Sequence, residues 1–390
     1  MSSIKKLFVV RFFAVCLALV VFPLRESQAL NDCQFRKTSS THYLLNDCTT
    51  DEPFFVPNKV TFNGTFHTIT VVDPIGGNFE GAVIKANGAS AKIYNVNIVT
   101  NLADFCPPGG ELVGLLFENG FGGAVDRVNL TINRGLASTC DQGVGIEVRK
   151  DFPPVPGGKA AKVTIKRTNI TNTQLAGIRA LGFVNVPMDS VNITGYGPTA
   201  ALAQTGVLFA NGAIGTFVKG TVINHVHEPM NDQPAAGILL SYAGRGVKID
   251  QSSIRVNDRG IHAFGGNSIT ISKNRVVDST LDGIKLEDVV GLPVTFSKIT
   301  DNESSKNLLN GIYLHQNAVG GMFKTQIKSN LVTRNHADGI LVEGDSNKLQ
   351  LNTLNLNHGV DIRNLGIQTY FVLNVCTSSF GPNVDCPVAP

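Results

Sequence analysis

The chain has 390 residues, of which 43% are hydrophobic and 16% are charged, and its formal net charge is +3. The first 29 residues hold four of the 33 basic residues and one of the 30 acidic residues, so the rest of the chain carries 29 groups of each sign. A neutral chain lacks the basic field that a general nucleic-acid binder needs, and this class is excluded.

Residues 1–29 have the pattern of a secretory signal peptide. Lys5, Lys6 and Arg11 precede the apolar run FFAVCLALVVF, and the small residues Ser27 and Ala29 precede a cleavage point. The apolar run is too short for a membrane span. We therefore expect a secreted or periplasmic mature chain that is monomeric and makes no membrane contact.

The rest of the chain repeats one pattern, in which a glycine starts a short strand of alternating apolar residues. These landmark glycines recur at intervals of 20 to 33 residues. They are Gly81, Gly114, Gly145, Gly177, Gly206, Gly237, Gly260, Gly283, Gly311, Gly339 and Gly359. Repeated strands without helical periodicity predict an all-β fold, a single-stranded right-handed parallel β-helix (a solenoid) of about eleven coils.

Within this solenoid we expect an N-terminal cap over 30–75, the β-helix over 76–368 and a C-terminal tail or cap over 369–390. Five longer segments precede the earlier landmark strands and could wall one side of their sheet. They span 102–112, 134–144, 151–159, 195–205 and 225–236.

Asparagines recur at fixed distances before the landmark glycines. Asn274, Asn302 and Asn330 each stand nine residues before one, and Asn307 and Asn335 each stand four before one. Asn tolerates the left-handed conformation of a sharp corner, and stacked Asn side chains can bond to one another. We expect asparagine corners whose side chains link coil to coil, and glycine corners at which a side chain would clash.

Six cysteines follow the signal, and an even number in an exported chain indicates disulfides. Their positions in the repeats narrow the fifteen pairings that six cysteines allow. Two lie in the cap, two in corresponding loops of adjacent coils and two in the tail. The predicted bridges are Cys33–Cys48, Cys106–Cys140 and Cys376–Cys386.

The cap region YLLNDCTTDEPFFVPNKVTFNGTFHTITVVDP, followed by these repeats, resembles secreted right-handed parallel β-helix proteins of the pectin-lyase-like superfamily. The resemblance covers residues 31–390. The superfamily includes pectate and alginate lyases, polygalacturonases, alginate epimerases and NosD-type proteins of copper assembly, so it implies a fold more firmly than an activity. The polygalacturonase motifs and the Asp-Pro-His-Glu motif of alginate epimerases are absent.

If the residue after each landmark glycine points inward, the residues two and four places after the glycine point outward. His262, Lys285 and Tyr313 then stack in successive coils, and Glu287 and His315 stack in the neighbouring row together with Glu343. Uronate lyases and epimerases need a base, an acid and cations that stabilise the enediolate. We therefore take five residues as candidate catalytic groups: His262, Lys285, Tyr313, His315 and Glu287. Among them, Tyr313 or His315 could be the acid and the base, and Lys285 could neutralise a substrate carboxylate.

A second candidate site is the segment His225-Val226-His227-Glu228. Two histidines two residues apart on extended backbone point the same way, and the carboxylate beside them could complete a zinc or copper site. Ordinary exposed histidines are the alternative. No motif specifies a cofactor; calcium, zinc and copper are the candidate ions.

Two hypotheses for the function follow. The first is an exported protein that binds or processes extended polysaccharide on its exposed sheet by a lyase-like or epimerase-like reaction, with Glu147, Arg149 and Arg179 as a lesser, second cluster. The second is a non-catalytic surface or structural β-helix, or one that handles metal. The absence of Trp and the six Tyr argue against a platform for stacking sugars.

Overall fold

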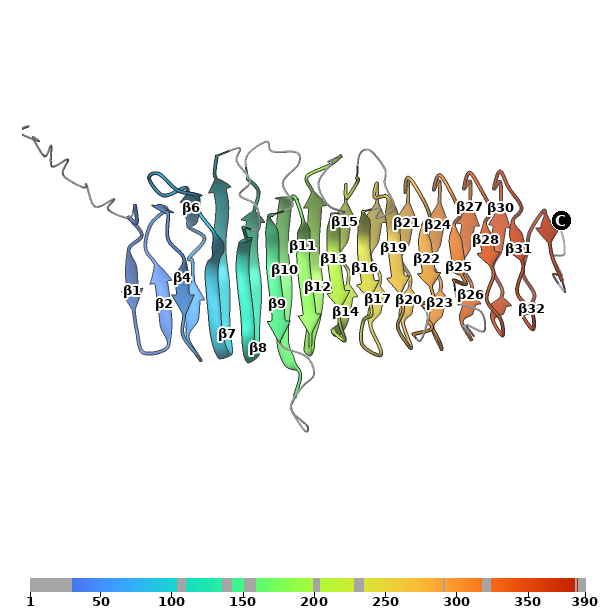
Figure 1. Ribbon diagram of the computed structural model, residues 1–390, viewed down its shortest axis with the longest axis horizontal. Coiled ribbons are helices and arrows are strands. Elements are labelled where there is room, and N and C mark those ends of the chain that lie inside the picture. The colour runs from blue at the N-terminus through green and yellow to red at the C-terminus, as the bar shows by residue number, and fades with distance from the viewer. Residues whose placement is uncertain are drawn as a thin grey trace, which may run out of the picture.

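The computed structural model describes residues 30–103, 110–134, 142–150, 159–198, 204–227, 235–289, 292–317, 324–382 and 384. These residues form 33 strands and no helix, and the strands stack along one long axis (Figure 1). No helix in this part of the chain is long and apolar enough to cross a membrane.

The strands wind around a single core in three parallel sheets. Sheet 1 contains the strands that follow the landmark glycines: β4 (Phe54–Val56), β7 (Gly81–Asn101), β8 (Leu112–Thr131), β9 (Val144–Lys150), β11 (Ala176–Gly182), β13 (Thr205–Ala210), β16 (Ala236–Ser241), β19 (Arg259–Phe264), β22 (Ile284–Glu287), β25 (Ile312–His315), β28 (Ile340–Val342), β31 (Ile362–Asn364) and β33 (Ser379–Phe380).

The other two sheets complete each coil, and the long strands β7, β8, β10 and β12 bend from one sheet into the next. Sheet 2 adds β2 (Thr41–Leu44), β5 (Thr61–Asn63), β10 (Ala161–Thr173), β12 (Val184–Gly195), β14 (Ile214–Val218), β17 (Lys248–Asp250), β20 (Thr270–Ser272), β23 (Lys298–Thr300), β26 (Gln326–Lys328), β29 (Lys348–Gln350) and β32 (Tyr370–Val372). Sheet 3 adds β3 (Cys48–Thr50), β6 (Thr68–Val72), β15 (Thr221–Ile223), β18 (Ser253–Arg255), β21 (Arg275–Val277), β24 (Glu303–Ser305), β27 (Leu331–Thr333) and β30 (Thr353–Asn355). Only β1 (Phe35–Lys37) pairs antiparallel among these named strands, with β2.

The eleven described strands of sheet 1 from β7 to β31 confirm the predicted β-helix. Each pairs in parallel with its equivalent in the next coil, so from Gly114 to Gly339 the residue after each landmark glycine stacks on its counterpart. Ile146 pairs with Ile178, and Ile261 pairs with Ile284. All four of these side chains are completely buried. The core is therefore a set of aliphatic rows that run along the axis.

Most landmark glycines mark a close approach inside the coil. A Cβ on Gly145 would lie 2.5 Å from Cγ2 of Ile170, and one on Gly177 would lie 2.3 Å from Cγ2 of Ile193, which belong to the opposite wall. Since real atoms do not approach so closely, a side chain there would push the two walls apart.

The register differs from the prediction at the first and last coils. Ala82 pairs with Val113, so Val83 rather than Gly81 occupies the position of Gly114. Ile340 pairs with Ile362, and thus Asp361 rather than Gly359 takes the last landmark position. Coil length varies at both ends, and a fixed glycine spacing could not locate these strands.

The asparagines form the predicted ladders, but they are not the left-handed residues. Asn302 Nδ2 donates to Oδ1 of Asn330 at 3.0 Å, and Asn330 Nδ2 donates to Oδ1 of Asn352 at 2.9 Å. The residues with positive φ are those just before them, such as Asp301 (57°) and Ser329 (55°). The turn therefore comes one residue earlier, and it directs each asparagine side chain into the interior, where the ladder satisfies buried backbone groups.

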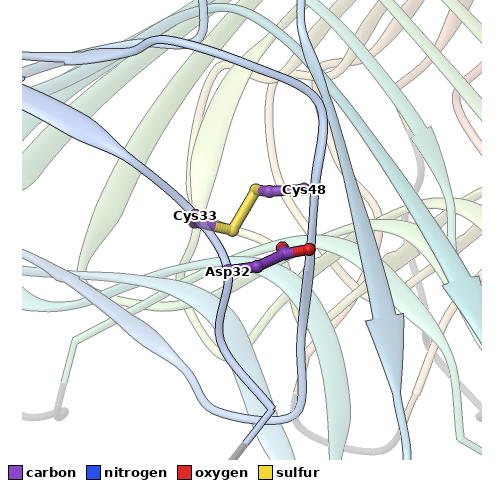
Figure 2. Close-up of side chains that lie close together, drawn as sticks. All are labelled: Asp32, Cys33 and Cys48. Carbon is purple, nitrogen blue, oxygen red and sulfur yellow. A yellow bond between two sulfur atoms is a disulfide. The ribbon is translucent and has the colours of Figure 1, made fainter.

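The N-terminal end is closed by β1 and by a disulfide between Cys33 and Cys48, as predicted (Figure 2). Cys376 is also disulfide-bonded. Its predicted partner Cys386 and the predicted pair Cys106 and Cys140 lie outside the described residues, so these two bridges stay predictions.

Replacing a ladder asparagine should destabilise the whole rod. Asn330→Ala would leave Nδ2 of Asn302, the carbonyl of Ile299 and Oδ1 of Asn352 each short of a bond inside the core. We expect the free energy of unfolding to fall by about 3 to 5 kcal/mol. Asn192→Ala, in an exposed ladder, is the matched control and should cost under about 1 kcal/mol. Chemical denaturation measures both; equal losses would contradict the ladder argument.

Peptide mapping of the non-reduced chain tests the remaining bridges. We expect fragments that join Cys106 to Cys140, which were predicted to occupy corresponding loops of adjacent coils, and Cys376 to Cys386, which share the C-terminal tail. A fragment joining Cys376 to Cys106 or Cys140 would contradict that assignment.

Candidate functional site

The outer face of sheet 1 carries a buried polar network, here called the inner network (His262, Lys285 and Glu287). His262 on β19 pairs in register with Lys285 on β22. Oε2 of Glu287 lies 2.7 Å from Nζ of Lys285 and 3.1 Å from Nε2 of His262. Asn317 donates its side-chain amide to the other carboxylate oxygen. The three side chains are only 9 to 12% exposed, so water barely reaches them.

Burial decides the protonation states of this network. It lowers the pKa of His262 to about 4, so the imidazole is neutral at pH 7. Arg259 Nη1 lies 3.4 Å from Nδ1 of His262, and this contact assigns the proton to Nε2, which donates to Glu287. Burial alone would raise the pKa of Glu287, but the hydrogen bonds from His262 and Lys285 hold it well below its ordinary value. The network therefore contains a Lys285–Glu287 ion pair and a neutral histidine.

The next coils continue the row with a more accessible cluster, here called the outer triad (Tyr313, His315 and Glu343). The Tyr313 hydroxyl donates to Oε1 of Glu343 at 2.9 Å, and Nδ1 of His315 lies 2.6 Å from Oε2 of the same carboxylate. The side chains of His315 and Glu343 are 25% and 26% exposed. Lys285 Nζ lies 5.4 Å from the centre of the Tyr313 ring, which links the outer triad to the inner network.

The outer triad has the arrangement of a proton-transfer site. Nδ1 of His315 lies 2.6 Å from both the Tyr313 hydroxyl and Oε2 of Glu343, and a carboxylate accepts hydrogen bonds, so we assign the hydrogen of a neutral His315 to Nδ1. Nε2 of His315 is then the unprotonated nitrogen, and within the described part of the chain no residue bonds to it. Burial and the hydrogen bond to Glu343 raise the pKa of Tyr313, so its hydroxyl stays protonated. The geometry provides a base oriented by a carboxylate, with a neutral acid beside it.

The predicted rows are confirmed, since Lys285 pairs with Tyr313 and Glu287 pairs with His315. The structure nevertheless divides the five predicted catalytic residues into the inner network and the outer triad. Lys285 is occupied by Glu287, and a substrate carboxylate would have to compete with that partner.

Two residues of the site, Arg259 and Asn317, were missing from the predicted rows, and a third, Glu343, was placed in a row but was given no catalytic role. Glu343 holds the outer triad together, and its position four residues after a landmark glycine was the available signal. Arg259 and Asn317 lie outside the two predicted rows, so no repeat position marked them.

The second predicted cluster is an extended ion-pair network on the same sheet. Arg149 contacts Glu118 at 2.7 Å, Glu111 at 2.8 Å and Glu147 at 3.1 Å. Arg179 lies 3.5 Å from the other oxygen of Glu147. Burial raises the pKa of Glu147, which has no exposed surface. Each charge here has a partner on the protein, which is typical of a structural network.

The histidines of the candidate metal site are buried rather than exposed. His225 is completely buried, its Nδ1 lies 3.0 Å from Oδ1 of Asn257, and burial lowers its pKa to about 4. The ring edge that carries Nε2 packs against Gly195 and Gly206. His227 is also buried, and Glu228 lies outside the described residues. The metal site stays a prediction, and His225 could join it only through Nε2.

Among the described residues, one group of three potential ligands converges, namely Asp32, Cys33 and Cys48. Figure 2 shows why this is not a metal centre: the two sulfur atoms are bonded to each other. A disulfide offers no thiolate. Asp32 instead accepts a hydrogen bond from the backbone N–H of Thr49 at 2.5 Å, which ties the segment just before β1 to β3.

A parallel solenoid with charged groups on one outer face is the class of protein that the structure defines. Residues 157–354, just over half of the chain, match the family described as the right handed beta helix region, and the chain belongs to this family. No curated protein matches its sequence.

Two solved structures are similar in fold. The periplasmic alginate epimerase AlgG is 12% identical, with a TM-score of 0.51 over 84% of this chain and 78% of the epimerase. The Dettilon tailspike protein is 13% identical, with a TM-score of 0.55 over 85% of this chain and 61% of the tailspike. At such identities the likeness concerns the fold alone.

Two of the buried histidines, His225 and His262, should make stability fall with acidity. Each has a folded pKa of about 4 against an ordinary value of 6.5. The unfolded chain therefore binds more protons between these values, and stability decreases as the pH falls through that window. From pH 7 to pH 5 each histidine should contribute a loss of about 2 kcal/mol.

Denaturation of His225→Asn and His262→Gln at both pH values measures these contributions. Each variant should lose about 2 kcal/mol less than the parent on acidification. His336→Gln, at an exposed position, is the control and should follow the parent. Variants that keep the full pH dependence would contradict the assignment of neutral buried imidazoles.

Proposed function

We propose that this chain acts outside the cytoplasm, where it binds an extended polysaccharide along the outer face of sheet 1 and transfers a proton at the outer triad. The observation that carries the proposal is the pairing of His315 with Glu343, which leaves Nε2 of His315 as an unbonded base on a partly exposed surface. The disulfide between Cys33 and Cys48 supports an oxidising compartment.

The shape of the site favours a long ligand over a compact one. The inner network and outer triad occupy four successive strands, β19, β22, β25 and β28. At the spacing of paired strands, this series is roughly 15 Å long. A polymer that runs along the axis would meet these groups in order. AlgG, a neighbour in fold, is an alginate epimerase, and this supports a polysaccharide as the class of ligand.

The chemistry follows from the positions of the protons. His315 Nε2 would accept a proton from a sugar carbon next to a carboxylate, and Glu343 would stabilise the resulting imidazolium. Tyr313, held neutral by its raised pKa, would donate the proton that completes an elimination or an epimerisation. The inner network would act as a support, because Lys285, which is held by Glu287, lies over the ring of Tyr313.

Binding and turnover are tested separately. Alginate, polygalacturonate and cellulose oligosaccharides are offered to the purified chain, and calorimetry measures binding. Turnover is followed as unsaturated sugar ends and as exchange of the C5 proton in deuterated water. We expect His315→Ala to reduce turnover by about 10²-fold or more while affinity stays within a few-fold. Glu343→Gln should reduce turnover and shift its pH profile, because His315 loses the carboxylate that orients it.

His336→Ala is the matched control, since it removes an exposed histidine from another part of the coil. If the unmodified chain binds none of the three polymers, the proposal is wrong and a structural β-helix is favoured. Binding without turnover or proton exchange would leave a carbohydrate-binding protein and remove the catalytic role. Full turnover in His315→Ala would exclude the outer triad as the site.

A further inference from the structure

An apolar shelf lies beside the inner network, at the end of the site nearer the N-terminus. Ser241 of β16 pairs with Phe264 of β19, and Phe264 pairs with Glu287 of β22. Tyr242 follows directly after β16, and its ring centre lies 5.5 Å from that of Phe264 in an edge-to-face arrangement. Phe264 therefore stands in the same outer row as Glu287 and His315, and the ring of Tyr242 packs against it from the bend that follows β16.

Leu292 extends this surface on the side of Gly265. A Cβ placed on Gly265 would lie 3.5 Å from Cδ1 of Tyr242 and 3.6 Å from Cβ of Leu292, so these two side chains flank a residue that has none. Tyr242 is 37% exposed and Leu292 is 51% exposed. The apolar shelf (Tyr242, Phe264 and Leu292) is thus open where Gly265 leaves room.

We infer that the apolar shelf is a sugar-binding subsite. This inference rests on the proposed function, and it adds where and how the polysaccharide is held. A pyranose ring has an apolar face of C–H groups that packs on the electron-rich face of an aromatic ring. Its hydroxyl groups need polar partners at the rim, and no described residue bonds to the Tyr242 hydroxyl, which is free to meet one.

The register also fixes the distance between the shelf and the outer triad. Phe264 pairs with Glu287, which pairs with His315, so the Phe264 end of the shelf lies two coils away from the proposed base, and Tyr242, which packs on Phe264 from the end of β16, lies one coil further. Two strand spacings are roughly 10 Å, about the length of two residues of an extended sugar chain. The sugar at the Phe264 end of the shelf is therefore two residues away from the sugar at His315, and the chain runs along the axis.

This placement predicts that the shelf matters only to ligands of three or more sugars. Affinities of di-, tri-, tetra- and hexasaccharides from the alginate, polygalacturonate and cellulose series are measured for the parent and for Tyr242→Ala. For tri- and longer saccharides we expect Tyr242→Ala to weaken binding about tenfold or more, whereas binding of disaccharides stays within twofold. With polymer as substrate, KM should rise and kcat should change little.

Two further variants separate binding from folding. Tyr242→Phe keeps the ring and should retain most of the affinity. Any loss of affinity in this variant, smaller than the loss in Tyr242→Ala, would measure the contribution of the hydroxyl. Tyr370→Ala removes a tyrosine that is 67% exposed on sheet 2, and it should bind all ligands as the parent does. Circular dichroism confirms that each variant is folded.

The outcomes distinguish this inference from the proposed function. A parent that binds no saccharide overturns both. A parent that binds long saccharides, with Tyr242→Ala unchanged at every length, overturns the shelf alone and leaves the outer triad in place. Equal losses for disaccharides and hexasaccharides would overturn the two-residue spacing. A loss of affinity in Tyr242→Ala that is absent for disaccharides and present for trisaccharides supports the subsite.

Discussion

Parallel pairing of each strand with its equivalent in the next coil is the interaction on which the whole structure depends. It places every residue above a counterpart one strand spacing away, so any property that a position has is repeated along the rod. Inside, repetition is favourable for aliphatic side chains, which form continuous rows. For polar side chains it is tolerable only where donors and acceptors alternate, and the asparagine amide, with one of each, meets that condition.

The same pairing restricts which charged side chains can follow one another on the outer face of sheet 1. Identical charges one strand spacing apart would repel, so a row of titratable groups must vary from coil to coil. The inner network meets this condition with His262 neutral and Lys285 paired with Glu287. Burial then shifts the pKa values, because a shielded ion pair and a neutral imidazole are the states of lowest free energy there. The proposed reaction is placed at His315 and Glu343 because their side chains are more exposed than those of the inner network.

Fold and activity are separate questions in this family, because the residues that build the coil are not the residues that could react. The ladders, the landmark glycines and the aliphatic rows would be the same in an enzyme and in a scaffold. What distinguishes the two here is a local arrangement: a histidine whose proton position is fixed by a carboxylate, next to a protonated tyrosine. Phe264, in the same row as Glu287 and His315, belongs to the apolar shelf that we infer to hold the polysaccharide along the axis.

The sequence by itself determined the solenoid and the stacking of His262 on Lys285 and Tyr313, because a pattern that recurs at eleven glycines averages out local ambiguity. The sequence also determined the Cys33–Cys48 bridge, because these two cysteines share the cap. It could not place Val83 and Asp361, since the end coils depart from the period. Nor could it reveal the Tyr242–Phe264 pair, because Tyr242 follows its strand and belongs to neither outward row. Only the tertiary structure decided which groups are buried, and burial sets the protonation states: a period tells which residues are neighbours, whereas their charges depend on how much water surrounds them.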